Sequence, residues 1–528
     1  MDRKEEIRSG NVLIGIEFGS TRIKAVLIGR DHAPLASGVC DWENKLENGI
    51  WTYSLEDVKQ GLQTCFADLM QKTQAEYGVP LTKAAGMGIS AMMHGYLAFD
   101  AAGELLVPFR TWRNTVTGEA AEKLTAAFSF NIPQRWSIAH LYQAILNKEP
   151  HVADIRKLNT LAGYVHTLLT GKHVLGIGDA SGMFPIDPAS GSYDAAMIEK
   201  FAALTADTPF QQKLTDVLPE IVPAGECAGT LTAEGAKLLD PTGQFGAGVP
   251  LCPPEGDAQT GMAATNSVTP KTGNVSAGTS IFAMIVLEKN LSAVHREIDI
   301  VTTPSGDPVA MVHCNNCSSD LDAWVSMFGG LLKAAGAEMP KGKLYDLLYD
   351  LAAAGDPDCG GIISYNYYAG EEITGLTAGK PLVLRDPGSA LTIQNFMRSQ
   401  VYACMATLKL GMDILTETEH VALEQIYAHG GLFKTPTASQ PALAAALGTD
   451  VTLMQSAGEG GAWGIALLAA YAARENRAET LAEYLNAHVF AGMQGVRVSP
   501  KQTDTEGLRA YMTAYKNCLA AEKAAATV

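Results

Sequence analysis

A short pattern of strand, small-residue turn and strand occurs twice in the 528-residue sequence, and it constrains the fold more than any other feature. The first copy is GIEFGSTRIKAVLI (residues 15–28), and the second is GNVSAGTSIFAMIV (residues 273–286). The two turns lie about half a chain length apart. Gly-Ser-Thr turns are common by chance, but each copy is flanked by apolar runs. We interpret the recurrence as a duplication in which each half begins with a β-hairpin.

Strand and helix patterns alternate in both halves. Ser54 begins a capping sequence that predicts a helix to about Tyr77. The apolar run 84–90 predicts a buried strand, and helical patterns dominate residues 119–169. In the second half, residues 392–415 predict a long helix and residues 425–428 a strand. The pattern predicts two layered α/β domains with a cleft between them.

The boundary between the halves is expected shortly after a Gly- and Pro-rich stretch, residues 225–256. We place it near residues 266–271. This gives an N-terminal domain of residues 1–268 and a C-terminal domain of residues 269–528, consistent with the usual size of domains.

The amino-acid composition excludes some classes of binding partner and indicates the cellular compartment. The formal net charge of −17 argues against nucleic acid or an anionic membrane as the main partner. No run approaches the roughly 18 apolar residues of a membrane span, and the charged start MDRKEEIRSG shows no secretory signal. The nine cysteines, an odd and scattered number, favour reduced thiols. We therefore expect a cytoplasmic protein.

The two turns have the chemistry of anion sites. Consecutive backbone N–H groups in such turns bind anions, and the hydroxyls of Ser20, Thr21 and Thr279 add hydrogen-bond donors. Lys24 adds positive charge. A polyphosphate held by both turns is the expected ligand. Glu17, at the end of the first strand, is placed to hold Mg²⁺ directly or through water. The alternative for each turn alone is a plain hairpin.

Two further motifs carry candidate residues. In EGDAQTG, Asp257 has small neighbours, and such a carboxylate can accept the proton of a hydroxyl that attacks phosphorus. Asp257 is also a suitable N-cap for the helix that follows, and both roles are compatible. In HGGLFKTP, Gly430 and Gly431 allow the backbone to approach a flat ligand such as adenine or ribose closely.

The pair of cysteines in CNNC (residues 314–317) suggests a metal or redox site. No second Cys pair or His pair stands at zinc spacing, and only His313 lies nearby. We therefore expect a loop before a helix, with Ser318 or Ser319 as its cap.

In order along the chain, seven segments resemble motifs of the FGGY carbohydrate kinases. They are GIEFGSTRIKA, GISAMMHGYLAFD, TWRN, GDASGMFPID, EGDAQTG, SAGTS and HGGLFKTP. The family shares the duplicated actin and hexokinase type of domain, which is ribonuclease H-like. The resemblance extends from about residue 12 to residue 471 and is closest to xylulokinases, through Met-His-Gly and Asp-Ala-Ser-Gly.

The resemblance implies an ATP- and Mg²⁺-dependent sugar kinase and a role for each matching residue. Asp257 would be the general base, and Glu17 would stand at the metal position. The ATP phosphates would lie along Ser20, Thr21, Lys24 and Thr279, and the adenosine along Gly430 and Gly431. The sugar would contact Met93, His94, Trp112 and Asn114. Homodimers occur in the family, but no stretch of this sequence marks an interface.

Several positions depart from the family pattern. Glu17 replaces an aspartate, Trp-Arg-Asn replaces Trp-Asn-Asp, and Ala91-Met92 precedes Met-His-Gly in place of Gly-Gln. A ketopentose such as xylulose is the expected substrate, with L-ribulose, L-xylulose and related polyols as alternatives. Two other functions stay open: an actin-like nucleotide-driven binding module, and a kinase-like protein that has lost activity through Glu17.

Overall fold

The computed structural model describes residues 2–454 and 460–528. The chain forms two compact units. Unit 1 comprises Met1–Val268, Asp299–Val309 and Glu459–Gly492, and unit 2 comprises Thr269–Ile298, Ala310–Gly458 and Met493–Val528. The chain first passes from unit 1 to unit 2 between Val268 and Thr269. The return of two later segments to unit 1 has no counterpart in the sequence-based division.

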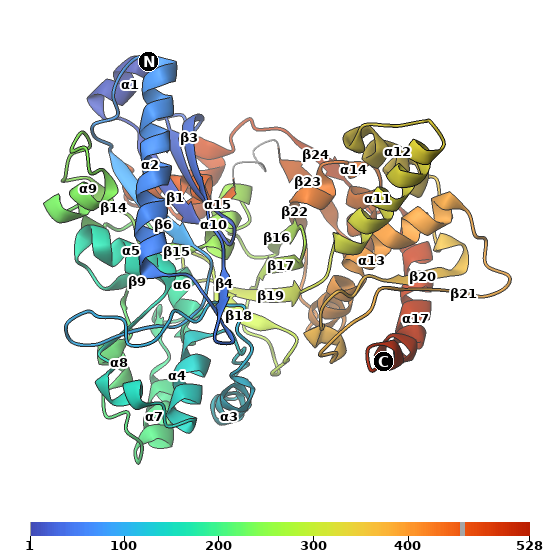
Figure 1. The fold of residues 1–528 in the computed structure, drawn as a ribbon, viewed down its shortest axis with the longest axis horizontal. Coiled ribbons are helices and arrows are strands. Elements are labelled where there is room, and N and C mark those ends of the chain that lie inside the picture. The colour runs from blue at the N-terminus through green and yellow to red at the C-terminus, as the bar shows by residue number, and fades with distance from the viewer. Residues whose placement is uncertain (1, 455–459) are drawn as a thin grey trace. The chain divides into compact units, whose positions relative to one another are not determined.

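A twisted mixed sheet forms the centre of unit 1 (Figure 1). Its strand order is β13 (Gly229–Thr230), β14 (Pro250–Leu251), β6 (Gly86–Ala91), β1 (Leu13–Phe18), β2 (Arg22–Ile28) and β3 (Pro34–Asp41). Strands β1, β2 and β3 are antiparallel neighbours, whereas β1 and β6 run parallel. The short strand β15 (Glu255–Gly256) also pairs in parallel with β6. The expected hairpin at residues 15–28 is therefore β1 and β2.

Side chains alternate across β1 and so divide the contacts between two helices. Ile14, Ile16 and Phe18 belong to the buried cluster that also contains the apolar side chains of α2 (Leu55–Tyr77), whose N-cap is Ser54 as predicted. Gly15 lies beneath α15 (Gly460–Ala472). A Cβ at Gly15 would stand 2.0 Å from a backbone oxygen of α15, so glycine is required for this close approach. Glu17, two residues on, shares that face.

The remaining elements of unit 1 are mostly helical. The region 119–169, expected to be helical, also contains the strand β8 (Lys157–Asn159), because these residues pair with β7 from a distant part of the chain. The helices are α1 (Arg3–Ser9), α3 (Gly118–Phe128), α4 (Ser137–Leu146), α5 (Leu161–Thr170), α6 (Ile177–Ser181), α7 (Ala195–Thr205), α8 (Leu214–Val217), α9 (Ala233–Leu239), α10 (Asp257–Thr265) and α16 (Leu481–Tyr484). Additional short strands are β4 (Lys45–Glu47), β5 (Ile50–Thr52), β7 (Leu97–Phe99), β9 (Val174–Gly176), β10 (Ile186–Asp187), β11 (Ser192–Tyr193) and β12 (Glu220–Val222).

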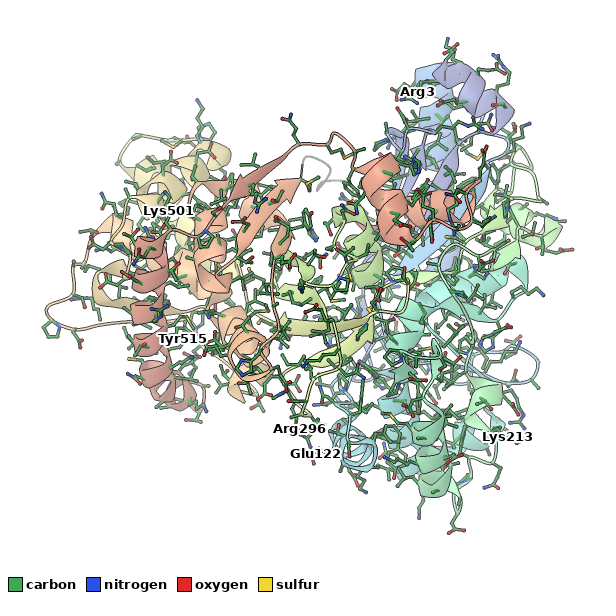
Figure 2. The ribbon with its side chains drawn as sticks, turned by 180° about the vertical axis from the view of Figure 1, so that it is seen from behind. Arg3, Glu122, Lys213, Arg296, Lys501 and Tyr515 are labelled. Atoms are coloured by element: carbon green, nitrogen blue, oxygen red, sulfur yellow. The ribbon has the colours of Figure 1, made fainter. Side chains whose placement is uncertain are left out.

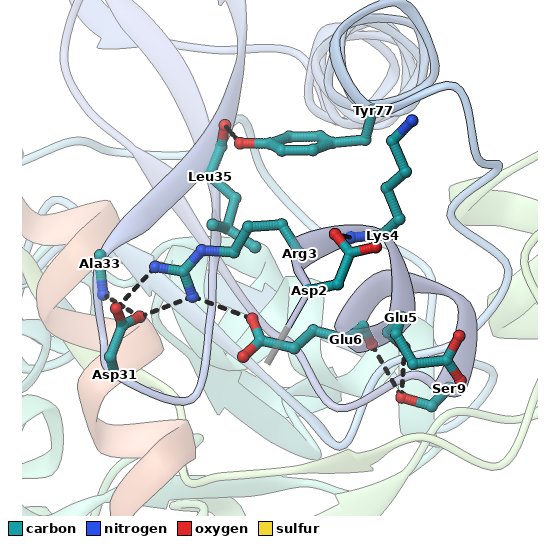
Figure 3. A network of polar contacts seen from close by, with 10 residues as sticks. All are labelled: Asp2, Arg3, Lys4, Glu5, Glu6, Ser9, Asp31, Ala33, Leu35 and Tyr77. Atoms are coloured by element: carbon teal, nitrogen blue, oxygen red, sulfur yellow. Dashed lines mark hydrogen bonds and ion pairs between the residues drawn. The ribbon is translucent and has the colours of Figure 1, made fainter.

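The N-terminal helix α1 is fastened to the turn between β2 and β3 by charged side chains (Figure 3). Arg3 donates to Asp31 at 2.6 and 3.0 Å and to Glu6 at 3.0 Å. Tyr77, at the end of α2, donates to the carbonyl of Leu35 at 3.0 Å. These contacts hold the outer end of the hairpin in place.

Unit 2 repeats the strand arrangement of unit 1. Six consecutive strands of its sheet lie in the order β19 (Pro308–Cys314), β17 (Ile281–Val286), β16 (Thr272–Ala277), β22 (Gln425–His429), β23 (Asp450–Met454) and β24 (Gly495–Val498). Strands β16 and β17 are antiparallel, and β16 runs parallel to β22. The pair β16 and β17 therefore corresponds to β1 and β2 of unit 1, and the pair β16 and β22 corresponds to β1 and β6. The shared topology supports the duplication inferred from the two turns.

Unit 2 also contains the strands β20 (Ile362–Tyr365) and β21 (Leu382–Arg385). Its described residues form five long helices, namely α11 (Ser319–Ala334), α12 (Lys341–Ala353), α13 (Ile393–Asp413), α14 (Pro436–Leu447) and α17 (Gln502–Ala525). Helix α14 begins at Pro436, a residue that suits the first turn of a helix. Tyr515 of α17, labelled in Figure 2, donates to the hydroxyl of Tyr367 at 2.9 Å. Among the described residues, no helix is both long enough and apolar enough to cross a membrane.

Candidate active site

The predicted base and the predicted metal residue lie at the same edge of the sheet of unit 1. Glu17 on β1 stands opposite Ser90 on β6, and Glu255 on β15 also stands opposite Ser90. Asp257 follows β15 directly and begins α10. Because the carboxyl ends of these parallel strands meet at one edge, the two carboxylates come together from segments far apart in the sequence.

Asp257 is held by backbone amides in a half-buried position. The amide of Met93 donates to Oδ1 of Asp257 at 3.2 Å. Burial raises the pKa of the Asp257 carboxyl to about 6, and the hydrogen bonds from the amides of Met93 and Ala258 oppose that rise. A carboxylate with a pKa near 6 is ionised at neutral pH and is a stronger base than an ordinary aspartate, which suits proton abstraction.

Glu17 reaches the N-terminus of the 13-residue helix α15. The amide of Ala462 donates to Oε2 of Glu17 at 3.2 Å. A Cβ at Gly461 would lie 2.4 Å from Oε1, so glycine at 461 leaves the room that the longer acid needs. Burial raises the pKa of Glu17 to about 7, the negative charge of Asp257 adds to the rise, and amide hydrogen bonds and Lys24 oppose it.

The two carboxylates fit a magnesium site of the kind that nucleotide enzymes use. Each is half-buried, and the charge of Asp257 disfavours the charge of Glu17, so a cation would relieve the repulsion. Within residues 2–454 and 460–528, no three His, Cys, Asp or Glu side chains group as a metal site. Mg²⁺ commonly takes one or two carboxylates and completes its shell with phosphate oxygens and water. The donor set therefore suits Mg²⁺ bound together with a nucleotide.

The turn between β1 and β2 is fixed through its carbonyl groups. The indole of Trp42 donates to the carbonyl of Gly19 at 2.7 Å, and the hydroxyl of Tyr53 donates to that of Ser20 at 2.6 Å. The amide of Trp42 donates to the carbonyl of Thr21 at 3.2 Å. Thr21 is exposed, Ser20 is half-buried, and Lys24 is the cross-strand neighbour of Glu17. The turn is thus rigid, with hydroxyl groups accessible, as a phosphate site requires.

Met93 and His94 adjoin the predicted base. His94 has a φ of 68° and the following Gly95 one of 96°, a conformation that a side-chain-bearing residue rarely adopts. The ring Nδ1 of His94 lies 3.2 Å from the carbonyl of Gly182, and the ring stacks on Trp136 with centroids 6.2 Å apart. The backbone strain at His94 marks a position held by its surroundings, which is typical of functional sites.

The residues of the TWRN segment lie in different surroundings. Trp112 is half-buried against the core of unit 1. The amide side chain of Asn114 bonds to both backbone groups of Trp51, at 2.9 and 2.8 Å, and to the carbonyl of Thr111 at 2.9 Å. The guanidinium of Arg113 lies 3.8 Å from the centre of the Trp51 ring. These contacts give Asn114 a role in holding β5 beside Trp112.

The candidate nucleotide residues of unit 2 lie next to one another. Gly430 has a φ of 107°, and a Cβ there would stand 2.2 Å from the backbone oxygen of Ala277, the residue before the second turn. The amide and hydroxyl of Ser318 both donate to the carbonyl of Gly278, at 3.1 and 2.8 Å. Thr279 is exposed on this turn, and Gly431 begins a short 3₁₀ helix.

The loop after CNNC holds the second turn in place through Ser318. Helix α11 begins at Ser319 with Ser318 as its N-cap residue, as the sequence suggests, although the Ser318 hydroxyl is directed to Gly278. All nine cysteines are free thiols. The sequence did not select Glu255, Asp179 or Trp136, which adjoin the site. The only signals for the two acids were their places within EGDAQTG and GDASGMFPID.

A cavity of about 320 Å³ lies elsewhere in unit 1, against α7 and α8. Its lining includes Phe201, Phe210 and Lys213, the last of which is labelled in Figure 2. None of the predicted site residues lines it.

Comparisons with known proteins identify the family of this chain. Family models match residues 12–263 (FGGY family of carbohydrate kinases, N-terminal domain) and residues 273–473 (C-terminal domain of the same family). A xylulose kinase of Haemophilus influenzae is 24% identical over 442 residues, which cover 81% of this chain and 83% of the relative.

Two solved structures from Lactobacillus acidophilus have a similar fold. A ligand-bound xylulose kinase has a TM-score of 0.78 at 16% identity, covering 98% of this chain and 99% of its own. A gluconate kinase has a TM-score of 0.77 at 16% identity, covering 97% and 98%. At these identities the likeness establishes the fold alone, whereas the two family models together match most of the chain. The chain belongs to the FGGY family of carbohydrate kinases, which are phosphotransferases acting on sugars.

Proposed function

We propose that this kinase transfers the γ-phosphoryl group of ATP to a hydroxyl of a ketopentose, with xylulose as the first candidate. The observation that carries the proposal is the carboxylate of Asp257, held 3.2 Å from the amide of Met93 and so directly beside His94. This joins the predicted base to the segment that resembles the sugar-contacting part of xylulokinases. The similarity to a xylulose kinase over 81% of the chain supports the same substrate class.

In the proposed reaction, Asp257 accepts the proton of the attacking sugar hydroxyl as the new O–P bond forms. Its pKa of about 6 leaves it ionised at neutral pH and able to accept that proton. Met93 and His94 orient the sugar, with Trp112 as a flat apolar surface beside it. Ser20, Thr21 and Lys24 bind the phosphates and stabilise the negative charge that spreads over them in the transition state. In unit 2, Thr279 and the Gly430-Gly431 turn are the proposed contacts for phosphate and adenosine.

Glu17 is the proposed residue for Mg²⁺, and the carboxylate of Asp257 accepts the sugar proton. When bound, Mg²⁺ neutralises charge on the transferring phosphoryl group and orients the phosphate oxygens.

A substrate screen tests the proposal. Purified protein is mixed with ATP, Mg²⁺ and one compound from a panel of ketopentoses, polyols and aldonates, and ADP release is followed in a coupled assay. We expect the greatest stimulation by D-xylulose. Preference for L-ribulose, L-xylulose, a polyol or gluconate would replace the substrate but keep the reaction. ATP hydrolysis that no sugar stimulates would contradict the proposal.

Variants of the sugar-contacting residues separate substrate binding from nucleotide binding. His94→Ala and Trp112→Ala are each expected to raise the KM for the sugar about tenfold or more, as loss of a well-placed contact does. ATP binding, measured by calorimetry in the absence of sugar, is expected to stay close to wild type. An equal loss of ATP binding would show that the two residues are structural.

A further inference from the structure

A second pair of acidic side chains, Glu255 and Asp179, lies behind the predicted base. Each is only 1% exposed. Glu255 occupies β15, two residues before Asp257, and Asp179 lies in α6. Neither side chain has a part in the proposed reaction. Buried carboxyl groups are costly unless they are hydrogen-bonded, so their contacts indicate what they do.

Glu255 holds the beginning of α6. The amide of Asp179 donates to Oε2 of Glu255 at 2.7 Å, and the amide of Gly178 donates to Oε1 at 3.3 Å. The fit is close, because a Cβ at Gly176 would lie 2.2 Å from Oε1 and one at Gly178 would lie 2.5 Å from Oε2. Glycine at these two positions leaves the space that Glu255 occupies.

The other end of α6 holds His94 and Met93. The carbonyl of Gly182, the residue after α6, lies 3.2 Å from Nδ1 of His94. A Cβ at Gly182 would lie 2.7 Å from that nitrogen and 2.9 Å from Cε of Met93. Met93 in turn donates its amide to Asp257. Contacts therefore run in a closed ring from Asp257 through Met93, His94, α6 and Glu255 back to Asp257.

Asp179 ties the middle of this ring to the rest of unit 1. Its Oδ2 accepts the hydroxyl of Thr160, the N-cap of α5, at 2.6 Å. In the described part of the chain, its Oδ1 has no hydrogen-bond partner. Burial raises the pKa of Asp179 to about 7 and that of Glu255 to about 8.

We propose that Glu255 is a positioning residue that, through α6, sets the place of the Met93-His94 segment relative to Asp257. The inference rests on the proposed function for its kinetic consequences, whereas the positioning itself is a property of unit 1. Glu255 touches neither sugar nor nucleotide in this scheme. Loss of the Glu255 carboxylate is expected to displace Met93 and His94 relative to Asp257. A misplacement of about 1 Å in an active site lowers a rate by about a hundredfold.

The first test measures the structural link without any substrate. Glu255→Met removes both acceptors at nearly constant length, and Glu234→Met, on the exposed face of α9, is the matched control. Hydrogen–deuterium exchange is followed by mass spectrometry. In Glu255→Met we expect faster exchange both at residues 177–183 and at residues 92–95, with α2 unchanged. Faster exchange at 177–183 alone would overturn the proposal.

The second test is kinetic. Glu255→Met is expected to raise the KM for the sugar and to lower kcat/KM by about 10- to 100-fold, with the KM for ATP unchanged. Glu255→Gln, which keeps one acceptor oxygen, is expected to recover a large part of this loss. A purely structural role would reduce the active fraction, and hence kcat, without changing the KM for the sugar, and that result would refute positioning.

Gly182→Ala provides a route that does not disturb the buried acid. This substitution acts at the opposite end of α6, so it is expected to raise the KM for the sugar as Glu255→Met does. In the double variant Gly182→Ala/Glu255→Gln, the fold-increase in KM is expected to be smaller than the product of the fold-increases in the two single variants. If Glu255→Met does not fold, the kinetics of Gly182→Ala and Glu255→Gln, together with their hydrogen–deuterium exchange at residues 92–95, decide whether Glu255 positions the segment. If the wild-type chain phosphorylates no sugar, the proposed function fails, and the exchange experiment still decides whether Glu255 positions the segment.

Discussion

Replacing Glu17 by Gln isolates the electrostatic cost of the buried acid beside Asp257. The pKa of Glu17 is about 7 in the folded protein, against an ordinary 4.5. Each unit of pKa difference corresponds to about 1.4 kcal/mol, so an ionised Glu17 costs folding at most about 3.5 kcal/mol. Because the side chain is half-buried, solvent screening reduces the cost, and we expect about 1–2 kcal/mol.

The direction of the pH effect follows from the raised pKa. The folded protein holds the Glu17 proton more tightly than the unfolded chain does, so the associated stability is complete below about pH 4.5 and is lost as pH rises through about 7. Glutamine does not titrate. Relative to Glu17→Gln, the wild-type protein is therefore expected to lose stability between pH 5 and pH 8.

Thermal unfolding at pH 5 and pH 8, without nucleotide, measures this difference. Other buried acids such as Asp179 and Glu255 are present in both proteins, so their contributions largely cancel. Glu234→Gln, an exposed change, serves as the control. Adding Mg²⁺ and ATP together is expected to reduce the difference in thermal stability between wild type and Glu17→Gln at pH 8. Adding ATP with a chelator is expected to leave that difference unchanged. Parallel pH profiles for wild type and Glu17→Gln would refute the reasoning.

Three further outcomes are expected. Asp257→Asn keeps size but removes basicity, so sugar-dependent turnover should fall by roughly two to four powers of ten with ATP binding unchanged; near-normal turnover would remove Asp257 as the base. In the wild-type enzyme, kcat/KM for the sugar should decline below about pH 6, because the protonated Asp257 cannot accept a proton; a flat profile from pH 5 to 8 would contradict this. Gly430→Ala places a Cβ 2.2 Å from a backbone oxygen at a φ of 107°, so ATP affinity measured by calorimetry should fall while sugar binding persists; unchanged ATP affinity would exclude a nucleotide role for this turn.

The sequence alone determined the class of fold and the order of the motifs. The duplicated turn, the alternation of strand and helix patterns and the Ser54 cap are local signals, because strand periodicity and helix capping depend on residues close in the chain. The resemblance of seven ordered segments to the FGGY kinases indicated the family, which the family models confirm. The residue roles within the site stay predictions.

Only the tertiary structure brought Glu17 to the N-terminus of α15 and Glu255 to the N-terminus of α6. Gly15, Gly461 and Gly176 read locally as ordinary small residues. In the folded chain their lack of a side chain admits a helix or a carboxylate from a distant segment. Such contacts depend on which backbone segments approach each other within a few ångströms. This approach results from the packing of the whole unit, so it has no local signal in the sequence. The electrostatic coupling of the buried acids follows from the same packing, since burial, more than residue type, sets their pKa values.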